Sequence, residues 1–415
     1  MTTKPTTTIR IDEDLKRRAC EVFDDIGISM SAAVNTFLKA VVREGTMPFE
    51  IKIERPKSVF KTRNATLNNA FLLKKDEFYT QYDDISKEIS MYRGHLKGKS
   101  ILCNCDDPFE SAFFRFFAVN FEQLGLAKLV STCYAGSSLT GKEYPLENAT
   151  AAYKAEVTEV PDEPLVKADG SLDLESLFAM PGNSLMHLHG DGDFRSDECR
   201  ALLQEADIIV TNPPFSLFRE YIGLLTHHQK GFIILGNMNA ATYREVFPLF
   251  RDNYVWYGET IRSGDRKFYV PDDYPLNAAN CGMDDQGRRF IRVKGVRWFT
   301  NLDIRRRHKP LALTRHYRAE DYPKYENYDA IEVGQVHNIP ADYDGIMGVP
   351  ITFLDKYSPD QFEILMLANG NSRTNVSPEI LKSVAYRAHS EDRGGVGIIS
   401  GRRVYARILI RRKLR

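Results

Sequence analysis

The sequence predicts an α/β fold, in which parallel strands alternate with helices. Residues 207–210 form a short apolar run that is typical of a strand buried on both faces, and residues 231–236 form another. Between these runs, residues 217–225 show the apolar spacing of a helix. Strand, helix and strand at this spacing form a βαβ unit, which requires the two strands to be parallel.

Composition limits the class of protein and its compartment. The 415 residues are enough for two or three domains, and 56 basic residues balance 56 acidic ones. Because the net charge is zero, a nucleic-acid surface would have to come from local clusters of basic residues. Six cysteines without regular spacing indicate a reducing compartment, and we find no signal peptide or membrane-spanning run. We therefore expect a cytoplasmic protein that does not enter the membrane.

Residues 1–52 are predicted to form a separate module. Residues 6–11 alternate like a strand, with Thr6, Thr8 and Arg10 on one face, and two short amphipathic helices follow, ending near Gly27 and Gly45. One strand and two helices bury too small a core to fold alone, so we expect a homodimer.

This module resembles the RelB/DinJ antitoxin family of ribbon-helix-helix proteins, in TIRID, GISMSAAVNTFLKAVVREG and MPFEI, over about residues 5–52. The resemblance implies that two strands pair across the dimer axis and enter the DNA major groove, with Thr6, Thr8 and Arg10 facing the bases. The alternative is a dimerisation module without DNA contacts. Antitoxins of this family also bind a toxin through residues after the second helix. Here those residues continue into another domain, which argues against a toxin partner.

Residues 53–70 are polar and basic and are predicted to be a linker, and residues 71–255 are predicted to form a core domain. Within it we expect strands at 99–105 and 129–134, an aromatic helix between them that packs in the core, and an irregular peripheral insertion at about 140–185. Alternating His and Asp residues at 187–193 are compatible with a divalent metal, but we expect a strand that ends in an acidic loop, and no metal.

Asn212, Pro213, Pro214 and Phe215 directly follow the strand at 207–210. Two successive prolines cannot continue a β-ladder, so they hold the chain in an extended turn at a strand end, where open α/β sheets bind ligands. The Asn212 side-chain oxygen and the Pro213 carbonyl could accept the two N–H groups of a planar amine such as adenine N6. Phe215 could stack on the base, which would have to leave the duplex. The alternative is an ordinary turn between a strand and a loop.

Residues 256–415 show short strand patterns, turns and basic clusters. Basic residues flank Trp298 and Phe299, and such interleaving of cations with aromatic rings suits a DNA groove, whereas a solvated basic face is the alternative. The candidate DNA contacts are Arg292, Arg297, Arg305, Arg306 and Arg307. We expect this region to recognise the target and to complete the core.

Residues 70–415 resemble the EcoRI-type family of adenine-specific DNA methyltransferases, which belong to restriction-modification systems. The resemblance lies in KKDEFYT, CDDP with its aromatic helix, GDGDFRSDE, NPPF, KGVRWFTNL and GVPITFLDKYSPDQFEIL, which occur in family order. It implies a Rossmann-like core, S-adenosylmethionine as the donor and adenine N6 in double-stranded DNA as the acceptor.

Carried over by motif, NPPF at 212–215 would hold the target base, and the cofactor contacts would be Asp106, Asp193, Phe194, Phe78 and Thr80. The chain departs from methyltransferases in general by lacking the glycine turn after the first strand and the acidic residue after the second. We therefore expect a DNA adenine N6-methyltransferase with an added DNA-binding module. The alternatives are methylation of RNA adenine or protein glutamine, or an antitoxin-like repressor with an inactive methyltransferase domain.

Overall fold

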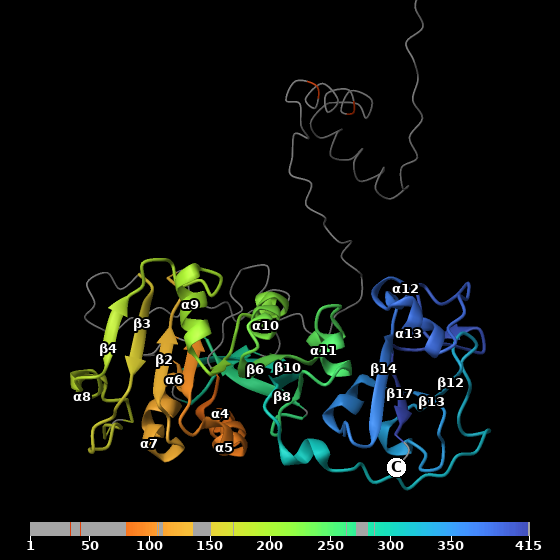
Figure 1. Cartoon of the computed structure of the whole chain (residues 1–415), viewed down its shortest axis with the longest axis horizontal. Helices are drawn as coiled ribbons and strands as arrows, with labels where there is room; N and C mark the ends of the chain where they lie inside the picture. The colour runs from red at the N-terminus through yellow and green to blue at the C-terminus, as the bar shows by residue number, and fades with distance from the viewer. Residues whose placement is uncertain are drawn as a thin grey trace, which may run out of the picture. The chain divides into compact units, whose positions relative to one another are not determined.

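The computed structural model describes Val34, Val42 and residues 80–105, 107, 111–135, 151–168, 170–262, 264–270, 281–285 and 287–413. Contacts divide the chain into two units, Met1–Thr62 and Arg63–Arg415, and the helices and strands labelled in Figure 1 belong to the second. The residues predicted to bind DNA or cofactor that lie outside the described residues are Thr6, Thr8, Arg10, Phe78 and Asp106.

An eight-stranded mixed sheet forms the centre of the second unit, in the order β4-β3-β2-β1-β5-β6-β11-β7. Its strands are β1 (Ser100–Asn104), β2 (Lys128–Thr132), β3 (Tyr153–Val157), β4 (Ser184–His187), β5 (Ile208–Thr211), β6 (Gly231–Asn237), β7 (Trp256–Tyr257) and β11 (Val296–Thr300). The four strands β2, β1, β5 and β6 run parallel, whereas β3, β4, β11 and β7 each pair antiparallel with a neighbour. The mixed sheet with its helices confirms the predicted α/β class.

The βαβ unit predicted from the apolar runs is present. Strand β5 leads through η2 (Phe215–Leu217) and α10 (Phe218–His227) into β6, which pairs parallel with it. Every residue of β5 is buried. Ile209 packs in the core cluster that contains Phe218 and Tyr221, whereas Ile208 and Val210 pack in the cluster that contains Phe113 and Phe117. Strand β6 pairs on its other edge with β11, so residues beyond 255 complete the sheet.

Helices on the two faces of the sheet supply its core. They are α4 (Tyr82–Ile89), η1 (Ser90–Tyr92), α5 (Arg93–Leu96), α6 (Ala112–Val119), α7 (Phe121–Leu124), α8 (Leu174–Ala179), α9 (Asp197–Glu205), η3 (Met238–Thr242) and α11 (Phe247–Arg251). The phenylalanines of α6 at 113, 114, 116 and 117 are all buried, so the aromatic helix is a core helix as predicted.

The segment at 140–185 is not the irregular insertion that we expected. Its described part holds β3, which lies between β2 and β4 in the sheet, and the helix α8. In β3, buried Tyr153, Ala155 and Val157 alternate with half-buried Lys154 and Glu156. This period of two is the pattern of a strand with one buried face, and the acidic composition around it obscured it.

The C-terminal part holds three small sheets, as its short strand patterns predict. They are β8-β10-β9, β12-β13-β17-β14 and the hairpin β15-β16. Their strands are β8 (Asp265–Tyr269), β9 (Cys281–Met283), β10 (Arg289–Lys294), β12 (Ala330–Glu332), β13 (Ile346–Val349), β14 (Phe362–Ala368), β15 (Ile398–Ile399), β16 (Arg402–Arg403) and β17 (Arg407–Arg412). The connecting helices are η4 (Arg305–His308), η5 (Val336–Asn338), η6 (Ile351–Asp355), α12 (Ser372–Asn375) and α13 (Pro378–Ser383).

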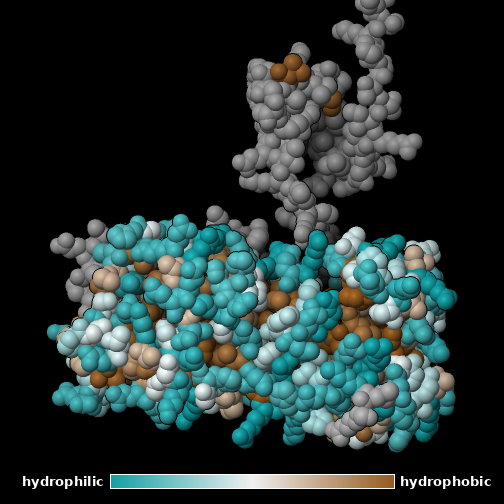
Figure 2. Space-filling model, in the orientation of Figure 1, coloured by the Kyte–Doolittle hydropathy of each residue, from teal (hydrophilic) through white to brown (hydrophobic). Residues whose placement is uncertain are grey.

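The visible face of this unit is mainly hydrophilic, and apolar residues show chiefly in its recesses (Figure 2). In the described part of the chain, every helix is too short or too polar to cross a bilayer.

Candidate active site

The carboxyl ends of six strands meet at one edge of the main sheet, here called the carboxyl edge. Strands β2, β1, β5 and β6 are parallel. Strands β4 and β7 have the same direction, because two antiparallel pairings separate β4 from β2 and two separate β7 from β6. Four of the six strands end in a buried polar residue: Asn104, Thr132, Thr211 and Asn237. Open α/β sheets bind their ligands at such an edge.

The Asn-Pro-Pro-Phe motif lies at the carboxyl edge, directly after β5. Asn212, Pro213 and Pro214 are buried, and Pro214 has the extended conformation (φ −52°, ψ 124°) that leads into η2. Phe215 is half-buried and packs against the core cluster that contains α6. The motif therefore follows a strand in the middle of the main sheet, and three of its four residues are buried.

Asn104 lies beside this motif, at the end of the neighbouring strand β1. The Thr211 hydroxyl donates a hydrogen bond to the backbone carbonyl of Asn104, and the Tyr221 hydroxyl donates one to its side-chain oxygen. Its side chain is only 2% exposed, and within the described residues its amide nitrogen Nδ2 has no hydrogen-bond partner. Asn104 thus presents an oriented donor at the carboxyl edge.

Thr132 pairs in register with Asn104 at the end of β2. Its side chain is 1% exposed, and its hydroxyl also finds no hydrogen-bond partner in the part of the chain that is described. Thr80, which precedes α4, is also buried, and its hydroxyl likewise has no hydrogen-bond partner among the described residues. A buried polar group without a partner costs about 1–3 kcal/mol, and a ligand that supplied the missing partner would remove this cost.

The turn after β1 replaces the glycine turn that we found missing. Cys105 has φ 65°, a left-handed conformation that favours glycine. Two residues later, buried Asp107 accepts a hydrogen bond of 2.7 Å from the Tyr153 hydroxyl on β3. Burial also raises the pKa of the Cys133 thiol to about 12, so this thiol stays protonated at neutral pH. The turn is therefore fixed by strand β3, which composition alone did not reveal.

The acidic loop after β4 packs closely on the end of β2. Gly192 has φ 77°, and a Cβ atom there would lie 2.1 Å from the carbonyl oxygen of Cys133, so only glycine fits. The Asp193 carboxylate accepts hydrogen bonds of 2.8 Å from the backbone N–H and the Nε of Arg195. The guanidinium of Arg195 lowers the pKa of Asp193 below its ordinary value, which keeps the carboxylate ionised.

Phe194 lies deeper than we expected for a residue at the cofactor. Its ring is 4% exposed and packs edge-on against Tyr221, with 5.0 Å between ring centroids. The ring of Phe194 thus lies between Tyr221 and the guanidinium of Arg195, whose carbon Cζ is 5.4 Å from the ring centroid.

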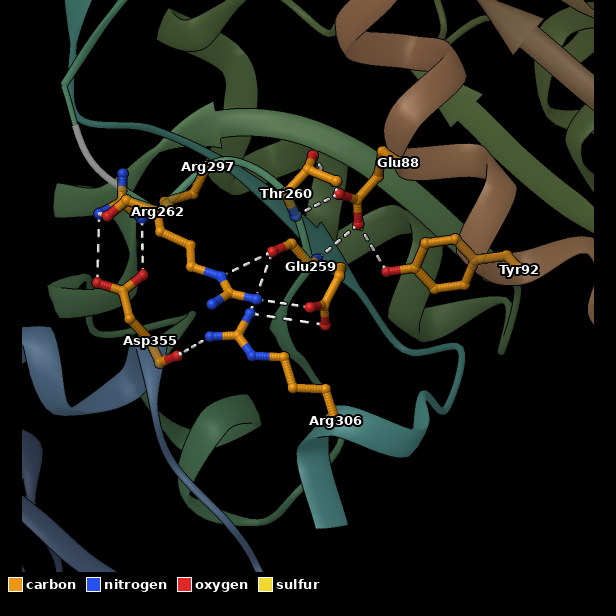
Figure 3. Close-up of polar contacts among 8 residues, drawn as sticks. All are labelled: Glu88, Tyr92, Glu259, Thr260, Arg262, Arg297, Arg306 and Asp355. Carbon is orange, nitrogen blue, oxygen red and sulfur yellow. Dashed lines mark hydrogen bonds and ion pairs between the residues drawn. The ribbon is translucent and has the colours of Figure 1, made fainter. Parts of the chain in front are cut away.

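The five candidate DNA contacts differ in exposure. Arg297 is 3% exposed and forms an ion pair with Asp355, with Nε 2.8 Å from Oδ1, so the expectation of an exposed DNA contact there is corrected (Figure 3). Arg306 and Arg307 are half-buried: Arg306 donates to the Glu259 carbonyl, and Arg307 stacks 3.6 Å over the Trp256 ring. The other two, Arg292 and Arg305, are exposed.

Comparison with known proteins identifies the family to which the chain is similar. The family model of the adenine-specific methyltransferase EcoRI matches residues 66–413, and that of the RelB antitoxin matches residues 6–64. The Type II methyltransferase M.EcoRI of Escherichia coli is 45% identical over 322 residues, which are 76% of this chain and 94% of the relative.

Two mycoplasma proteins are also similar. The Type II methyltransferase M.MpnI of Mycoplasma pneumoniae is 36% identical over 353 residues, and M.MgeORF184P of Mycoplasma genitalium is 35% identical over 354 residues. Each alignment covers 83% of this chain and 98% of the relative. No solved structure matches the chain. The family resemblance predicted from the motifs is thus confirmed, and the chain belongs to the EcoRI family of adenine-specific DNA methyltransferases, with a RelB antitoxin-like segment at its front.

Proposed function

We propose that the protein methylates adenine N6 in double-stranded DNA, and that Asn212, Pro213, Pro214 and Phe215 form the site that holds the target base. The observation that carries this proposal is the position of the motif at the carboxyl end of β5, next to the oriented amide of Asn104. In this proposal the Asn212 side-chain oxygen and the Pro213 carbonyl accept the two N–H groups of N6. The nitrogen lone pair, otherwise delocalised into the ring, then becomes available for attack.

The target base must leave the duplex to reach these groups, because they lie at a buried strand end. We assign Phe215 to stack on the flipped base, for which its half-buried ring is suited. Stacking of a base on an aromatic ring contributes about 1–3 kcal/mol, which offsets part of the cost of unstacking.

The carboxyl edge fits S-adenosylmethionine, which supplies an electrophilic methyl group on a sulfonium. Its carboxylate, hydroxyls and ring nitrogens need hydrogen-bond partners, and three buried side chains offer polar groups that no described residue satisfies: Thr80, Asn104 and Thr132. We propose that these three hold the cofactor together with Asp193 and with Asp106 and Phe78, which lie outside the described residues. Phe194 does not contact the cofactor in this proposal. It packs against Tyr221, whose hydroxyl donates a hydrogen bond to the Asn104 side chain.

We infer a Rossmann-like core at residues 71–255, completed by β7 and β11 from the recognition region at 256–415. The parallel order β2-β1-β5-β6, with ligand-binding groups at its carboxyl edge, supports this assignment. Arg292 and Arg305 are the candidates for direct contact with DNA, because both residues are exposed.

The match to the RelB family supports a further proposal for residues 1–52, joined to the core by residues 53–70. We propose a ribbon-helix-helix module that makes the protein a homodimer and presents Thr6, Thr8 and Arg10 to DNA. A toxin partner is the alternative use of this module. Because the proposed substrate is chromosomal DNA, we assign the protein to the cytoplasm.

The acceptor can be identified by supplying S-adenosylmethionine with a labelled methyl group and measuring incorporation into unmethylated genomic DNA, total RNA and denatured protein. The proposal requires label in DNA that is recovered as N6-methyladenine. Label in RNA adenine or protein glutamine, without label in DNA, would instead establish one of the alternative acceptors. DNA binding without any transfer would establish the repressor.

A further inference from the structure

A buried carboxylate fixes the loop that connects β7 with β8. Glu88 of α4 is fully buried and accepts four hydrogen bonds, from the Tyr92 hydroxyl, the backbone N–H groups of Glu259 and Thr260, and the Thr260 hydroxyl (Figure 3). Gly258 allows this approach, because a Cβ atom there would lie 2.2 Å from the Glu88 carboxylate. The loop at 258–262 is therefore held rigidly against the methyltransferase core.

Glu259 on this loop holds two arginines from different segments. Its carboxylate lies 2.5 Å from Nη2 of Arg262 and 3.6 Å from Nη1 of Arg306. Arg306 also donates hydrogen bonds to the Glu259 carbonyl (3.1 Å) and to the Asp355 carbonyl (2.7 Å). Each guanidinium has five donors, so both retain donors that these contacts do not use.

Asp355 at the end of η6 extends the same network to the C-terminal part of the chain. Its carboxylate accepts two hydrogen bonds from buried Arg297 of β11, at 2.8 and 3.2 Å (Figure 3). The pair therefore joins a strand of the main sheet to η6, which packs on β17 of the four-stranded sheet. The negative charge of Asp355 is balanced by Arg297, so it does not neutralise the other basic residues nearby.

A cleft of about 550 Å³ opens over this network, between the loop at 258–262, η5 and η6. Four basic side chains line it, namely Arg262, Arg306, His337 and Lys356, and the exposed Thr352 adds a hydroxyl. Among the described residues, Lys356 and His337 form no ion pair. The lining thus has more cationic groups than anionic ones, and Asp355, the one carboxylate in it, is already paired with Arg297.

We propose that this cleft binds a backbone phosphate of double-stranded DNA, with Lys356 as the principal charge and Glu259 as a positioning residue for Arg262 and Arg306. The inference rests on the proposed function, because DNA must be the substrate for this contact to form. A phosphate fits the site because it is an anion and because the guanidinium groups of Arg262 and Arg306 have unused N–H donors. The neighbouring carboxylate of Asp355 would not repel it strongly, since Asp355 is ion-paired with Arg297. Through Glu88 and Arg297, the contact would set the register of DNA relative to the core.

The test is the salt dependence of DNA binding by the full-length protein, measured by fluorescence anisotropy with a cognate and a non-cognate duplex. A lost phosphate contact lowers the slope of log K against log salt by about 0.9, which is about a 3.5-fold change in affinity between about 50 and 200 mM salt. We expect Lys356→Ala to show this reduced slope and to weaken binding of both duplexes equally. Lys97→Ala provides the matched control, because exposed Lys97 precedes β1 at the opposite edge of the sheet.

Two further variants separate charge from structure. Lys356→Arg should keep the wild-type slope, and Glu259→Gln should weaken DNA binding while cofactor affinity stays at the wild-type value. A wild-type slope in Lys356→Ala, in protein that methylates DNA normally, would overturn the cleft proposal alone. Failure of the wild-type protein to bind or methylate any duplex would overturn the proposed function as well, so the two failures are distinguishable.

Discussion

The hydroxyl of Tyr221, in the middle of α10, donates a hydrogen bond to the side-chain oxygen of Asn104, 117 residues earlier in the chain. The bond orients the Asn104 amide. Its nitrogen then remains at the carboxyl edge as a donor without a hydrogen-bond partner among the described residues. The strand β1, which we propose to bind the cofactor, is in this way connected to the helix that follows the Asn-Pro-Pro-Phe motif.

Replacing Tyr221 with phenylalanine should weaken cofactor binding. The ring remains in the core, but the Asn104 amide loses the bond that orients it, at a cost of about 1–3 kcal/mol. Isothermal titration with S-adenosylhomocysteine should therefore show a Kd roughly 5- to 150-fold higher. The control is Tyr254→Phe, since Tyr254 is 66% exposed. Equal affinities in the two variants would refute the positioning role of Tyr221.

Thr132→Val should separate stability from binding. Valine has nearly the shape of threonine but lacks the hydroxyl, which in the ligand-free protein is buried without a partner among the described residues. The variant should therefore be as stable as wild type or up to about 2 kcal/mol more stable in urea unfolding, and yet bind the cofactor less tightly. A variant that is destabilised but binds normally would show that Thr132 has only a structural role.

Glu88→Gln should destabilise the whole second unit. The glutamine amide places an N–H₂ group opposite the backbone N–H donors that Glu88 now satisfies, which leaves half-buried donors unpaired. We expect a loss of about 2 kcal/mol or more in the free energy of unfolding. The comparison is Glu122→Gln, because Glu122 is exposed on α7. A loss no larger than that of the control would contradict the role assigned to Glu88.

His308 should make the stability of the fold depend on pH. Its ring lies 2.9 Å from Asp360 and 3.0 Å from Asp303, and these carboxylates raise the pKa of His308 above its ordinary value. A raised folded-state pKa stabilises the protein fully below about pH 6.5, and this contribution is lost as pH rises through the raised value.

The Tm of His308→Gln should therefore lie below that of wild type at about pH 6 and approach it above the raised pKa. His187→Gln is the control, because exposed His187 lies at the end of β4. A difference in Tm between wild type and His308→Gln that stays constant with pH would exclude the charge on His308 as its cause.

Local patterns predicted the centre of the sheet well. The strands at 99–105, 129–134, 207–210 and 231–236 correspond to β1, β2, β5 and β6, because buried parallel strands give continuous apolar runs. The pattern at β3 was equally regular, but the acidic and proline-containing sequence around it suggested a loop.

The polar features of the site could not be predicted in the same way. Arg297 belongs to a basic cluster in the sequence, and only folding brings it to Asp355, 58 residues later. The buried polar groups of Asn104 and Thr132 become evident only when β1 and β2 are aligned in register. Sequence shows which groups are present, whereas burial and pairing depend on contacts between distant segments.

The most direct test of the account is the effect of Asn212→Ala on methyl transfer and cofactor binding, measured on the same preparation. The account predicts that transfer to DNA falls by at least about 100-fold, since the loss of one preorganised group at a reacting centre costs about 2.7–4 kcal/mol. The Tm and the affinity for S-adenosylhomocysteine should stay near their wild-type values. Methyl transfer at the wild-type rate by folded Asn212→Ala protein would contradict the claim that this residue activates the target amine.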